Sequence, residues 1–180
     1  MSYKVFGPHM AVLYAKSSSQ SELRSLGHYF NPTETLENKL GLAGASYELV
    51  QCVPKIVEYL RPVFSSSTEH EAKIQGILLD YLHKRGDVIV YGEPCADRNK
   101  RMPTVSFNVQ GWDPKTLVET VEKGTPFGFR WGHFYAKRLC DDILSCGENG
   151  VARVSMVHYN TEEEVRGLIE VFEKVLGSSV

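Results

Sequence analysis

One lysine and two arginines stand in local contexts that favour chemistry. Lys4 precedes the Gly7-Pro8 turn, and Arg130 and Arg153 each lie in a short apolar segment typical of a strand. A lysine amine held on rigid, partly desolvated backbone is a nucleophile, because burial lowers its pKa and frees the neutral form. A guanidinium in a cleft binds a carboxylate through two parallel hydrogen bonds. The three side chains therefore indicate a site for an aldehyde cofactor and a carboxylate substrate.

Each of these residues also has a plainer interpretation. A lysine so close to the start of a chain is ordinarily solvated. For Arg153, in the middle of its predicted strand, the alternative to substrate binding is a salt bridge across the sheet. For Arg130 and His133 the alternative is a strand end beside a packed Trp131. The residues alone leave these alternatives open.

The cysteines and the remaining histidines indicate no second site. The four cysteines, at positions 52, 95, 140 and 146, have no CxxC spacing, and no histidine pair has the spacing of zinc ligands. We therefore expect no metal site, and free thiols in a reducing, cytoplasmic setting. Unrelated disulfides are the alternative.

Composition sets wide limits on the class of protein. With 180 residues and 42% hydrophobic content, the chain is large enough for one globular core, with room for a smaller appendage. A formal net charge of -2 gives no electrostatic reason to expect nucleic acid or an anionic membrane as a partner. No apolar run approaches the roughly 20 residues that span a bilayer.

Hydrophobic periodicity predicts alternating strands and helices over the second half of the chain. Thr104–Val109 has the alternation of a half-buried strand, Asp113-Pro114 opens a helix, and Asn160 or Thr161 caps the last helix. Residues 17–46 lack periodicity and are predicted as mostly loop. The full prediction comprises strands over 11–15, 87–91, 104–109, 127–130 and 151–157, and helices over 48–60, 68–84, 113–123, 135–144 and from 161 onward.

Three regions follow from these elements. Residues 87–180 are expected to form a compact α+β sandwich with helices on one face of a mixed sheet. Residues 47–86 are predicted as linking helices, interrupted at Pro62 and the serines at 65–67. Residues 1–46 are expected to be the trailing edge of a larger domain.

Four segments, taken in order, carry a family resemblance. They are Ser2–His9, Gly44–Glu48, Arg130–His133 and Arg153–Thr161. The series resembles the second half of fold-type I pyridoxal-phosphate enzymes of the class V aminotransferase and cysteine desulfurase family. The resemblance implies an α/β fold in which residues 1–46 end the cofactor-binding large domain and residues 87–180 form the C-terminal small domain.

The resemblance also implies roles for individual residues. Lys4 is expected to form the Schiff base with pyridoxal 5'-phosphate and to move the α-proton of the substrate. Gly44 and Ala45 match a Gly-Thr pair that reaches the cofactor phosphate of the neighbouring subunit from a helix N-terminus, although Ala45 lacks the hydroxyl donor. Ser46, one position off in register, is the nearest hydroxyl. Arg153 is expected to bind the substrate carboxylate.

The loop from Arg130 to Ala136 departs from the desulfurase pattern. Arg130 and His133 match a loop over the active site and are expected to line the substrate pocket. Tyr135 stands where the desulfurases have a cysteine, and a phenol cannot attack the sulfur of a substrate as a thiolate does. Sulfur mobilisation through this loop is therefore not expected. Transamination, β-elimination and epimerisation of an amino acid stay open.

The expected partners follow from the same resemblance. It implies a transferase or lyase with an amino-acid substrate and a homodimer in the full-length form, with no nucleic acid and no membrane. The groups that the family places before the lysine are absent, including the aspartate that pairs with the pyridine nitrogen, so we expect the isolated fragment to be inactive. The alternative is a catalytically inactive small domain that acts as a binding or dimerisation module.

Overall fold

The structure is a computed structural model that describes residues 7–25, 35–41 and 44–177, without the side chains of 64–68. The chain divides into two compact units, Met1–Pro62 and Val63–Val180, and the boundary between them lies inside one helix. Among the described residues, no helix is both long enough and apolar enough to cross a membrane.

The N-terminal unit contains two short helices and the start of a long one. These are α1 (Ser17–Gln20), α2 (Leu36–Leu40) and the first part of α3 (Tyr47–Lys84). The prediction of loop over 17–46 is therefore wrong at α1 and α2. Helix α2 begins at a capping residue, because the hydroxyl of Thr35 accepts a hydrogen bond from the backbone N–H of Asn38.

The strand predicted over 11–15 is absent from the structure. The segment has no regular structure, and Val12, Leu13 and Tyr14 are 69%, 65% and 82% exposed. A strand needs a neighbour that takes up its backbone hydrogen bonds. The described part of this unit contains no strand that could pair with it, so apolar composition alone gave a wrong prediction.

Helix α3 is one helix of 38 residues where two were predicted. Pro54 and Pro62 both lie inside it. A proline removes one backbone hydrogen bond and costs about 3 kcal/mol in a helix interior, whereas a serine costs only a few tenths. The serines at 65–67 are therefore weak breakers, and packing along the rest of the helix outweighs the two prolines.

The C-terminal unit is built on a four-stranded sheet with the strand order β1-β2-β4-β3. Its strands are β1 (Val88–Tyr91), β2 (Thr104–Val109), β3 (Arg130–Gly132) and β4 (Val151–Ser155). All three neighbouring pairs are antiparallel, where a mixed sheet was predicted. The helical crossover after β2 places β3 on the far side of β4. β2 and β3 therefore run parallel to each other but are not neighbours. β3 also begins at the last residue of its predicted range.

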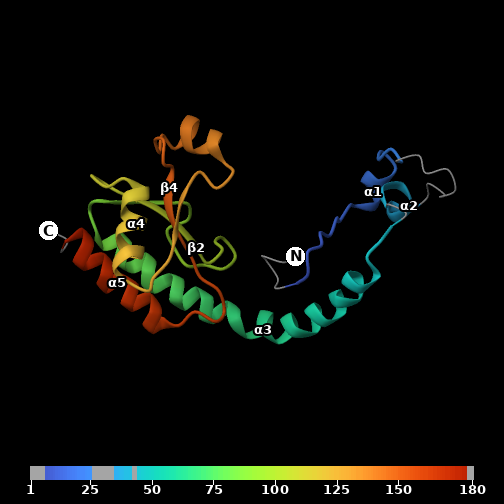
Figure 1. Cartoon of the computed structure of the whole chain (residues 1–180), viewed down its shortest axis with the longest axis horizontal. Coiled ribbons are helices and arrows are strands. Elements are labelled where there is room, and N and C mark those ends of the chain that lie inside the picture. The colour runs from blue at the N-terminus through green and yellow to red at the C-terminus, as the bar shows by residue number, and fades with distance from the viewer. Residues whose placement is uncertain (1–6, 26–34, 42–43, 178–180) are drawn as a thin grey trace. The chain divides into compact units, whose positions relative to one another are not determined.

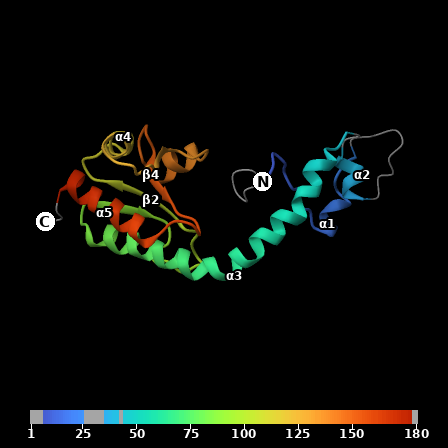
Figure 2. The same cartoon turned by 60° about the horizontal axis from the view of Figure 1, so that its bottom comes forward.

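Three helices cover one face of this sheet and confirm the α+β class of the unit. They are the second part of α3, α4 (Pro114–Gly124) and α5 (Glu162–Leu176), and Figures 1 and 2 show α5 alongside α3. The N-caps predicted for α4 and α5 are present, and at α5 the capping residue is Thr161 and not Asn160. Asp113 accepts a hydrogen bond from the backbone of Thr116, and Thr161 forms a reciprocal capping box with Glu164.

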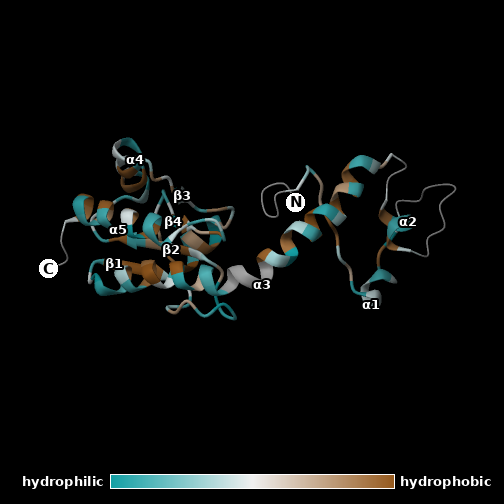
Figure 3. Ribbon diagram, turned by 90° about the horizontal axis from the view of Figure 1, so that it is seen from below, coloured by the Kyte–Doolittle hydropathy of each residue, from teal (hydrophilic) through white to brown (hydrophobic). Residues whose placement is uncertain are grey.

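The core lies between this helical layer and the sheet. Along β2 the side chains of Val105, Phe107 and Val109 are buried, as their alternation predicts. Phe172 of α5 is fully buried and meets Phe107 and Phe129 edge to face, with ring centroids 5.8 and 5.6 Å apart. In Figure 3 the hydrophobic colour gathers on the sides of the helices and strands that face each other.

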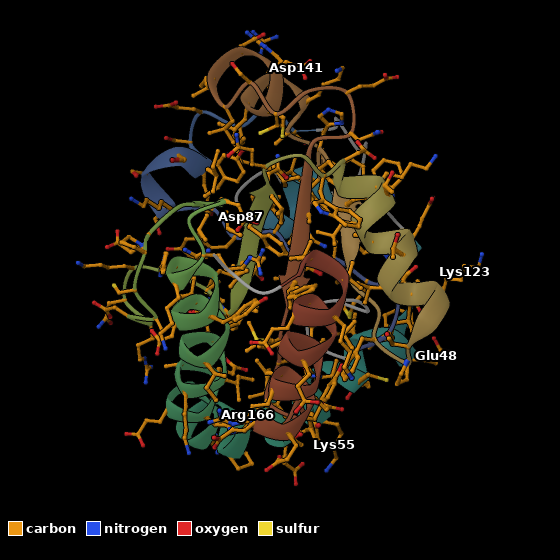
Figure 4. All side chains as sticks on the ribbon, turned by 90° about the vertical axis from the view of Figure 1, so that its left-hand side faces the viewer. Glu48, Lys55, Asp87, Lys123, Asp141 and Arg166 are labelled. Atoms are coloured by element: carbon orange, nitrogen blue, oxygen red, sulfur yellow. The ribbon has the colours of Figure 1, made fainter. Side chains whose placement is uncertain are left out.

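The buried Arg85 ties the ends of two helices together. Its guanidinium makes two hydrogen bonds to the carboxylate of Asp87, of 2.9 and 2.7 Å, and one of 2.9 Å to the carbonyl of Gly177 just after α5. Asp87 lies just beyond the end of α3 (Figure 4). The pair lowers the pKa of Asp87 below its ordinary value, through the hydrogen bonds to Arg85. A buried charge is tolerated here because it is paired.

The segment between β3 and β4 differs from the α-helix predicted over 135–144. It contains a π-helix, Leu139–Ile143, preceded by a turn in which Phe134 and Tyr135 both have left-handed backbone, with φ of 48° and 64°. Non-glycine residues adopt this conformation at a cost of about 1–2 kcal/mol each. Such a turn depends on tertiary contacts and has no signal in hydrophobic periodicity.

Gly150, directly before β4, is expected to tolerate no side chain. Its φ is +66°, and a Cβ atom would collide with the backbone of Gly132 on β3 and come within 2.9 Å of the N atom of His133. Replacing Gly150 by alanine should lower the free energy of unfolding by about 2–5 kcal/mol, from left-handed strain together with overpacking. Urea denaturation followed by circular dichroism measures this loss.

Gly111 provides the matched control for that substitution. Its φ is +81°, but no atom lies within 4 Å of a Cβ built there. Gly111→Ala should therefore show the strain alone, about 1–2 kcal/mol. Equal losses at the two positions would contradict a close backbone approach at Gly150.

Candidate carboxylate site

Arg153 lies on the sheet face that the helices do not cover. It occupies the middle of β4, where its partner on β2 is Ser106. Because Val105 and Phe107 point into the core, Ser106 and its partner Arg153 point to the opposite face. We call this the outer face; it carries Tyr91, Ser106, Asn108 and Arg153.

The guanidinium of Arg153 is half-buried and has no carboxylate partner among the described residues. Its Nε atom is buried without a hydrogen-bond partner in that part of the chain. The ring of Phe134 lies over it, with 3.8 Å between the guanidinium carbon and the ring centroid. Burial lowers the pKa of Arg153 from its ordinary value. The salt bridge across the sheet, the alternative interpretation, is not found among these residues.

Polar side chains surround Arg153 on the outer face. The amide nitrogen of Asn108 donates to the carbonyl of Gly150 over 3.1 Å and to the hydroxyl of Tyr91 over 3.4 Å. Its Oδ1 atom is buried and has no partner among the described residues. Burial, with a smaller contribution from a hydrogen bond to Cys146, raises the pKa of Tyr91 to about 12. The segment 133–150 therefore folds over part of this face.

Arg130 is close to Arg153 in the sheet but its charged group is engaged elsewhere. The two residues are partners across β3 and β4. The Nη1 atom of Arg130 lies 2.5 Å from the Oε1 atom of Glu122 on α4 and also donates to the carbonyl of Phe129 over 2.9 Å. The structure therefore does not bring the two guanidinium groups to one site, and the pairing with Glu122 links β3 to the helical layer.

His133 is held by the segment that follows it. Its Nε2 atom lies 3.4 Å from the carbonyl oxygen of Gly147 and 3.7 Å from the Oδ1 atom of Asp141. The same carboxylate forms a 2.7 Å ion pair with Lys137. Figure 4 shows Asp141 on the segment beyond the ends of the strands. His133 thus supports the loop that carries Phe134.

The loop of the desulfurase pattern carries no thiol in this chain, and Tyr135 at its cysteine position is fully exposed. All four cysteines are free in the structure, as predicted. Cys52 and Cys95 are exposed, whereas Cys140 is buried in the π-helix. Burial, and next the neighbouring Cys146, raise the pKa of the Cys140 thiol above its ordinary value. Cys140 is therefore poorly suited to act as a thiolate nucleophile.

The cysteines are expected to react at clearly different rates with an aromatic disulfide reagent at pH 8. Cys52 and Cys95 should react fast in the folded chain, and Cys140 should react slowly until urea is added, because its thiol is buried and stays protonated. Cys140→Ser should remove the slow phase and leave the fast one. Fewer than four reactive thiols in urea would contradict the absence of disulfides.

The predicted cofactor contacts belong to the N-terminal unit. Lys4 lies outside the described residues. Gly44 and Ala45 are exposed and stand directly before α3, and no atom lies within 4 Å of a Cβ built on Gly44. Ser46, the hydroxyl one position off in register, donates to a carboxylate oxygen of Glu48 over 3.3 Å.

The start of α3 fits the phosphate of pyridoxal 5'-phosphate in one respect and opposes it in another. The exposed N-terminus of a long helix offers backbone donors to a phosphate. Glu48 in the first turn places a negative charge at the same position, and its carboxylate accepts the hydrogen bond that the Ser46 hydroxyl donates. The described residues therefore supply at most part of a phosphate site.

A mostly apolar pocket of about 460 Å³ lies beside the Gly7-Pro8 turn. Its lining is Gly7, Pro8, Gln51, Cys52, Lys55, Ile56 and Tyr59, all within the N-terminal unit. Among the described residues no group of histidine, cysteine and carboxylate side chains could hold a metal ion.

Comparisons with known proteins connect this geometry to a family. The family described as aminotransferase class-V matches residues 46–168, more than half of the chain. The chain belongs to the class V aminotransferase family. This class V aminotransferase segment includes Arg130, His133 and Arg153, so the candidate carboxylate site lies within the matched part.

Two curated fungal proteins are similar to this member of the family over nearly all of its length. The aminotransferase-like protein FGM3 of Gibberella zeae is 46% identical over 178 residues, which cover 97% of this chain and 44% of that protein. The cysteine desulfurase-like protein ustD of Aspergillus flavus is 34% identical over 179 residues, which cover 97% and 41%. The chain therefore spans less than half the length of these relatives.

Solved structures support the same fold for this class V aminotransferase segment. The cysteine desulfurase CsdA of Escherichia coli is 21% identical with a TM-score of 0.61, and the match covers 77% of this chain and 33% of that one. A cysteine desulfurase of Thermococcus onnurineus is 23% identical with a TM-score of 0.59, covering 80% and 33%. At this identity the likeness is one of fold.

Sequence reasoning singled out Arg153 as a candidate and missed part of its surroundings. The loop from Arg130 to Tyr135 was predicted to shape the pocket, but Phe134 within it was given no role of its own and Tyr91 was not predicted as part of a site. One signal was available, since the alternation in β2 places Ser106 and Asn108 on the face away from the core. The position of Phe134 had no such signal, because it depends on left-handed backbone in a loop.

Proposed function

We propose that this chain is the C-terminal, carboxylate-binding portion of a pyridoxal-phosphate-dependent enzyme that acts at the α-carbon of an amino acid. The observation that carries the proposal is Arg153, a half-buried cation on the outer face with no carboxylate partner among the described residues. A buried guanidinium is stabilised by an anion. The carboxylate of an amino acid provides that anion and matches the guanidinium in shape.

The cofactor is part of the same proposal. When bound, pyridoxal 5'-phosphate supplies an electron sink for the bonds at the α-carbon of the substrate. Lys4 is the candidate for its covalent attachment and for moving the α-proton. Gly44 and Ala45, which precede the N-terminus of α3, are the candidates for contact with the cofactor phosphate. We propose that a second copy of the chain, in a homodimer, receives this contact.

The reaction class follows from what the loop lacks. Tyr135 stands where a sulfur-mobilising loop carries its cysteine, and Cys140 is buried with a raised pKa. Transfer or elimination at the amino acid therefore fits this loop better than desulfuration. Arg130 is not included in the proposed substrate contacts, because its guanidinium pairs with Glu122. His133 is included in the proposal only as a residue that supports the loop carrying Phe134.

Reductive trapping tests the cofactor part of the proposal. The purified chain is titrated with pyridoxal 5'-phosphate, reduced with borohydride and mapped by peptide mass spectrometry. The expected result is one dominant label on Lys4, which disappears in Lys4→Arg, while labelling of Lys16→Arg stays at the wild-type level. Weak labels scattered over many lysines would refute cofactor attachment at Lys4.

The exposed apolar residues of the N-terminal unit favour the second candidate, an inactive binding or dimerisation module. Val12, Leu13 and Tyr14 are each more than half exposed, as are Tyr47 and Tyr59 on α3. Clustered apolar exposure of this kind is typical of surfaces that associate with another protein. Sedimentation of a stable dimer that takes up no pyridoxal 5'-phosphate would favour this candidate over the enzyme.

A further inference from the structure

Phe134 contacts the guanidinium of Arg153, which has no carboxylate partner among the described residues. Its ring centroid lies 3.8 Å from the guanidinium carbon of Arg153, within the range of a cation–π contact. We propose that Phe134 is a positioning residue, whose ring fixes the plane of the Arg153 guanidinium so that its in-plane N–H groups stay directed at a carboxylate. This inference rests on the proposed function, in which Arg153 binds that carboxylate.

The backbone of the loop is built to hold the ring in this place. Phe134 and Tyr135 have φ of 48° and 64°, and the N–H of Ala136 closes the turn on the carbonyl of His133 over 2.8 Å. Left-handed backbone at two successive bulky residues persists only where the surroundings determine it. Tyr135 points to solvent and Phe134 is half-buried. The contact with Arg153 is therefore the interaction that the turn secures.

Stacking and carboxylate binding use different directions of the guanidinium. The five N–H donors of an arginine lie in the plane of the group, whereas an aromatic ring packs against its face. The Nε atom of Arg153 is buried without a partner, the side chain as a whole is half-buried, and its two terminal nitrogens have no partner among the described residues. A carboxylate in the plane thus reaches the terminal nitrogens while Phe134 covers the face.

The ring also changes the environment in which the carboxylate would bind. It excludes water from one face of the cation, in agreement with the lowered pKa of Arg153 that burial causes. Attraction between opposite charges is stronger where water is excluded. An arginine with its plane fixed also loses less rotational freedom on binding. Both effects raise carboxylate affinity without any contact between Phe134 and the ligand.

Nuclear magnetic resonance of the arginine side chains in the whole chain tests the contact and its consequence together. The Nε–Hε signal of Arg153 should be shifted upfield by the ring current of Phe134. Phe134→Leu should remove this shift and weaken the binding of propionate, titrated as the probe, about three- to tenfold. Phe134→Tyr, which keeps the ring, should preserve both.

Two further variants make the result unambiguous. Tyr135→Phe changes the exposed neighbour in the same turn and should leave the shift and the propionate affinity unchanged. Arg153→Gln should abolish propionate binding if the proposed function is right, and unchanged binding in it overturns both proposals. Loss of binding in Arg153→Gln together with wild-type affinity in Phe134→Leu overturns the positioning role alone. A loss in Tyr135→Phe equal to that in Phe134→Leu also overturns it.

Discussion

Replacing Phe172 by alanine is expected to lower the free energy of unfolding of the C-terminal unit by about 3–5 kcal/mol. The side chain is fully buried and forms edge-to-face contacts with Phe107 on β2 and with Phe129. Tyr81 of α3 stacks near it, with 6.4 Å between the ring centroids. Truncation therefore leaves a cavity where α3, α5 and the sheet meet. Equilibrium denaturation in urea measures the loss.

Glu170 provides the control for this substitution on the same helix. Its side chain is exposed on α5, two residues before Phe172. Glu170→Ala should change the free energy of unfolding by no more than about 0.5 kcal/mol. A loss below about 1.5 kcal/mol for Phe172→Ala would show that the core around this ring packs less closely than the structure has it.

Replacing Arg153 by alanine is expected to remove about 2–5 kcal/mol of binding free energy for a ligand that carries a carboxylate. This corresponds to the loss of a charge-assisted, two-point hydrogen bond at a partly desolvated site. The decisive measurement compares L-alanine with L-alaninamide, which differ in the carboxylate. The wild-type chain should prefer the acid, and Arg153→Ala should bind the two equally weakly.

Two controls separate local from general charge effects. Arg166, labelled in Figure 4, is an exposed arginine on α5 whose Nη2 atom lies 3.8 Å from the Oε2 atom of Glu162. Arg166→Ala carries the same change of net charge and should keep the preference for the acid. Arg153→Lys should retain part of it, because an ammonium keeps the charge but not the planar pair of donors. A wild-type preference in Arg153→Ala contradicts the assignment.

Local signals predicted the elements of the C-terminal unit well. The caps Asp113 and Thr161 can be predicted locally, because each side chain accepts a hydrogen bond from the backbone three residues further on. The alternation in Thr104–Val109 can be predicted because one face of the strand is buried. The order of the strands in the sheet could not be predicted from such local signals. It depends on contacts between distant segments, and the crossover through α4 gave an antiparallel sheet where a mixed one was predicted.

The same distinction applies to the candidate site. Arg153 was identifiable because a long cation in the middle of an apolar strand needs an explanation. The contact of Phe134 was not identifiable from the sequence. Its place over the guanidinium requires a positive φ, which steric clashes disfavour for aromatic residues and which no sequence pattern indicates. The pocket role predicted for Arg130 depended on the direction of its side chain. The sequence did not indicate that direction, because Glu122, the carboxylate that pairs with Arg130, lies eight residues away on α4.

The inner position of β4 has a consequence for the expected dynamics of the candidate carboxylate site. The strand of Arg153 pairs with neighbours on both sides, so we expect its amide to exchange with solvent only when the whole C-terminal unit unfolds. Phe134 lies on the loop between β3 and β4, outside the sheet, so we expect the amides of this loop to exchange with solvent faster than the amide of Arg153. The sheet thus fixes the backbone of Arg153, and the turn closed by the 2.8 Å hydrogen bond from Ala136 to His133 holds the Phe134 ring over its guanidinium.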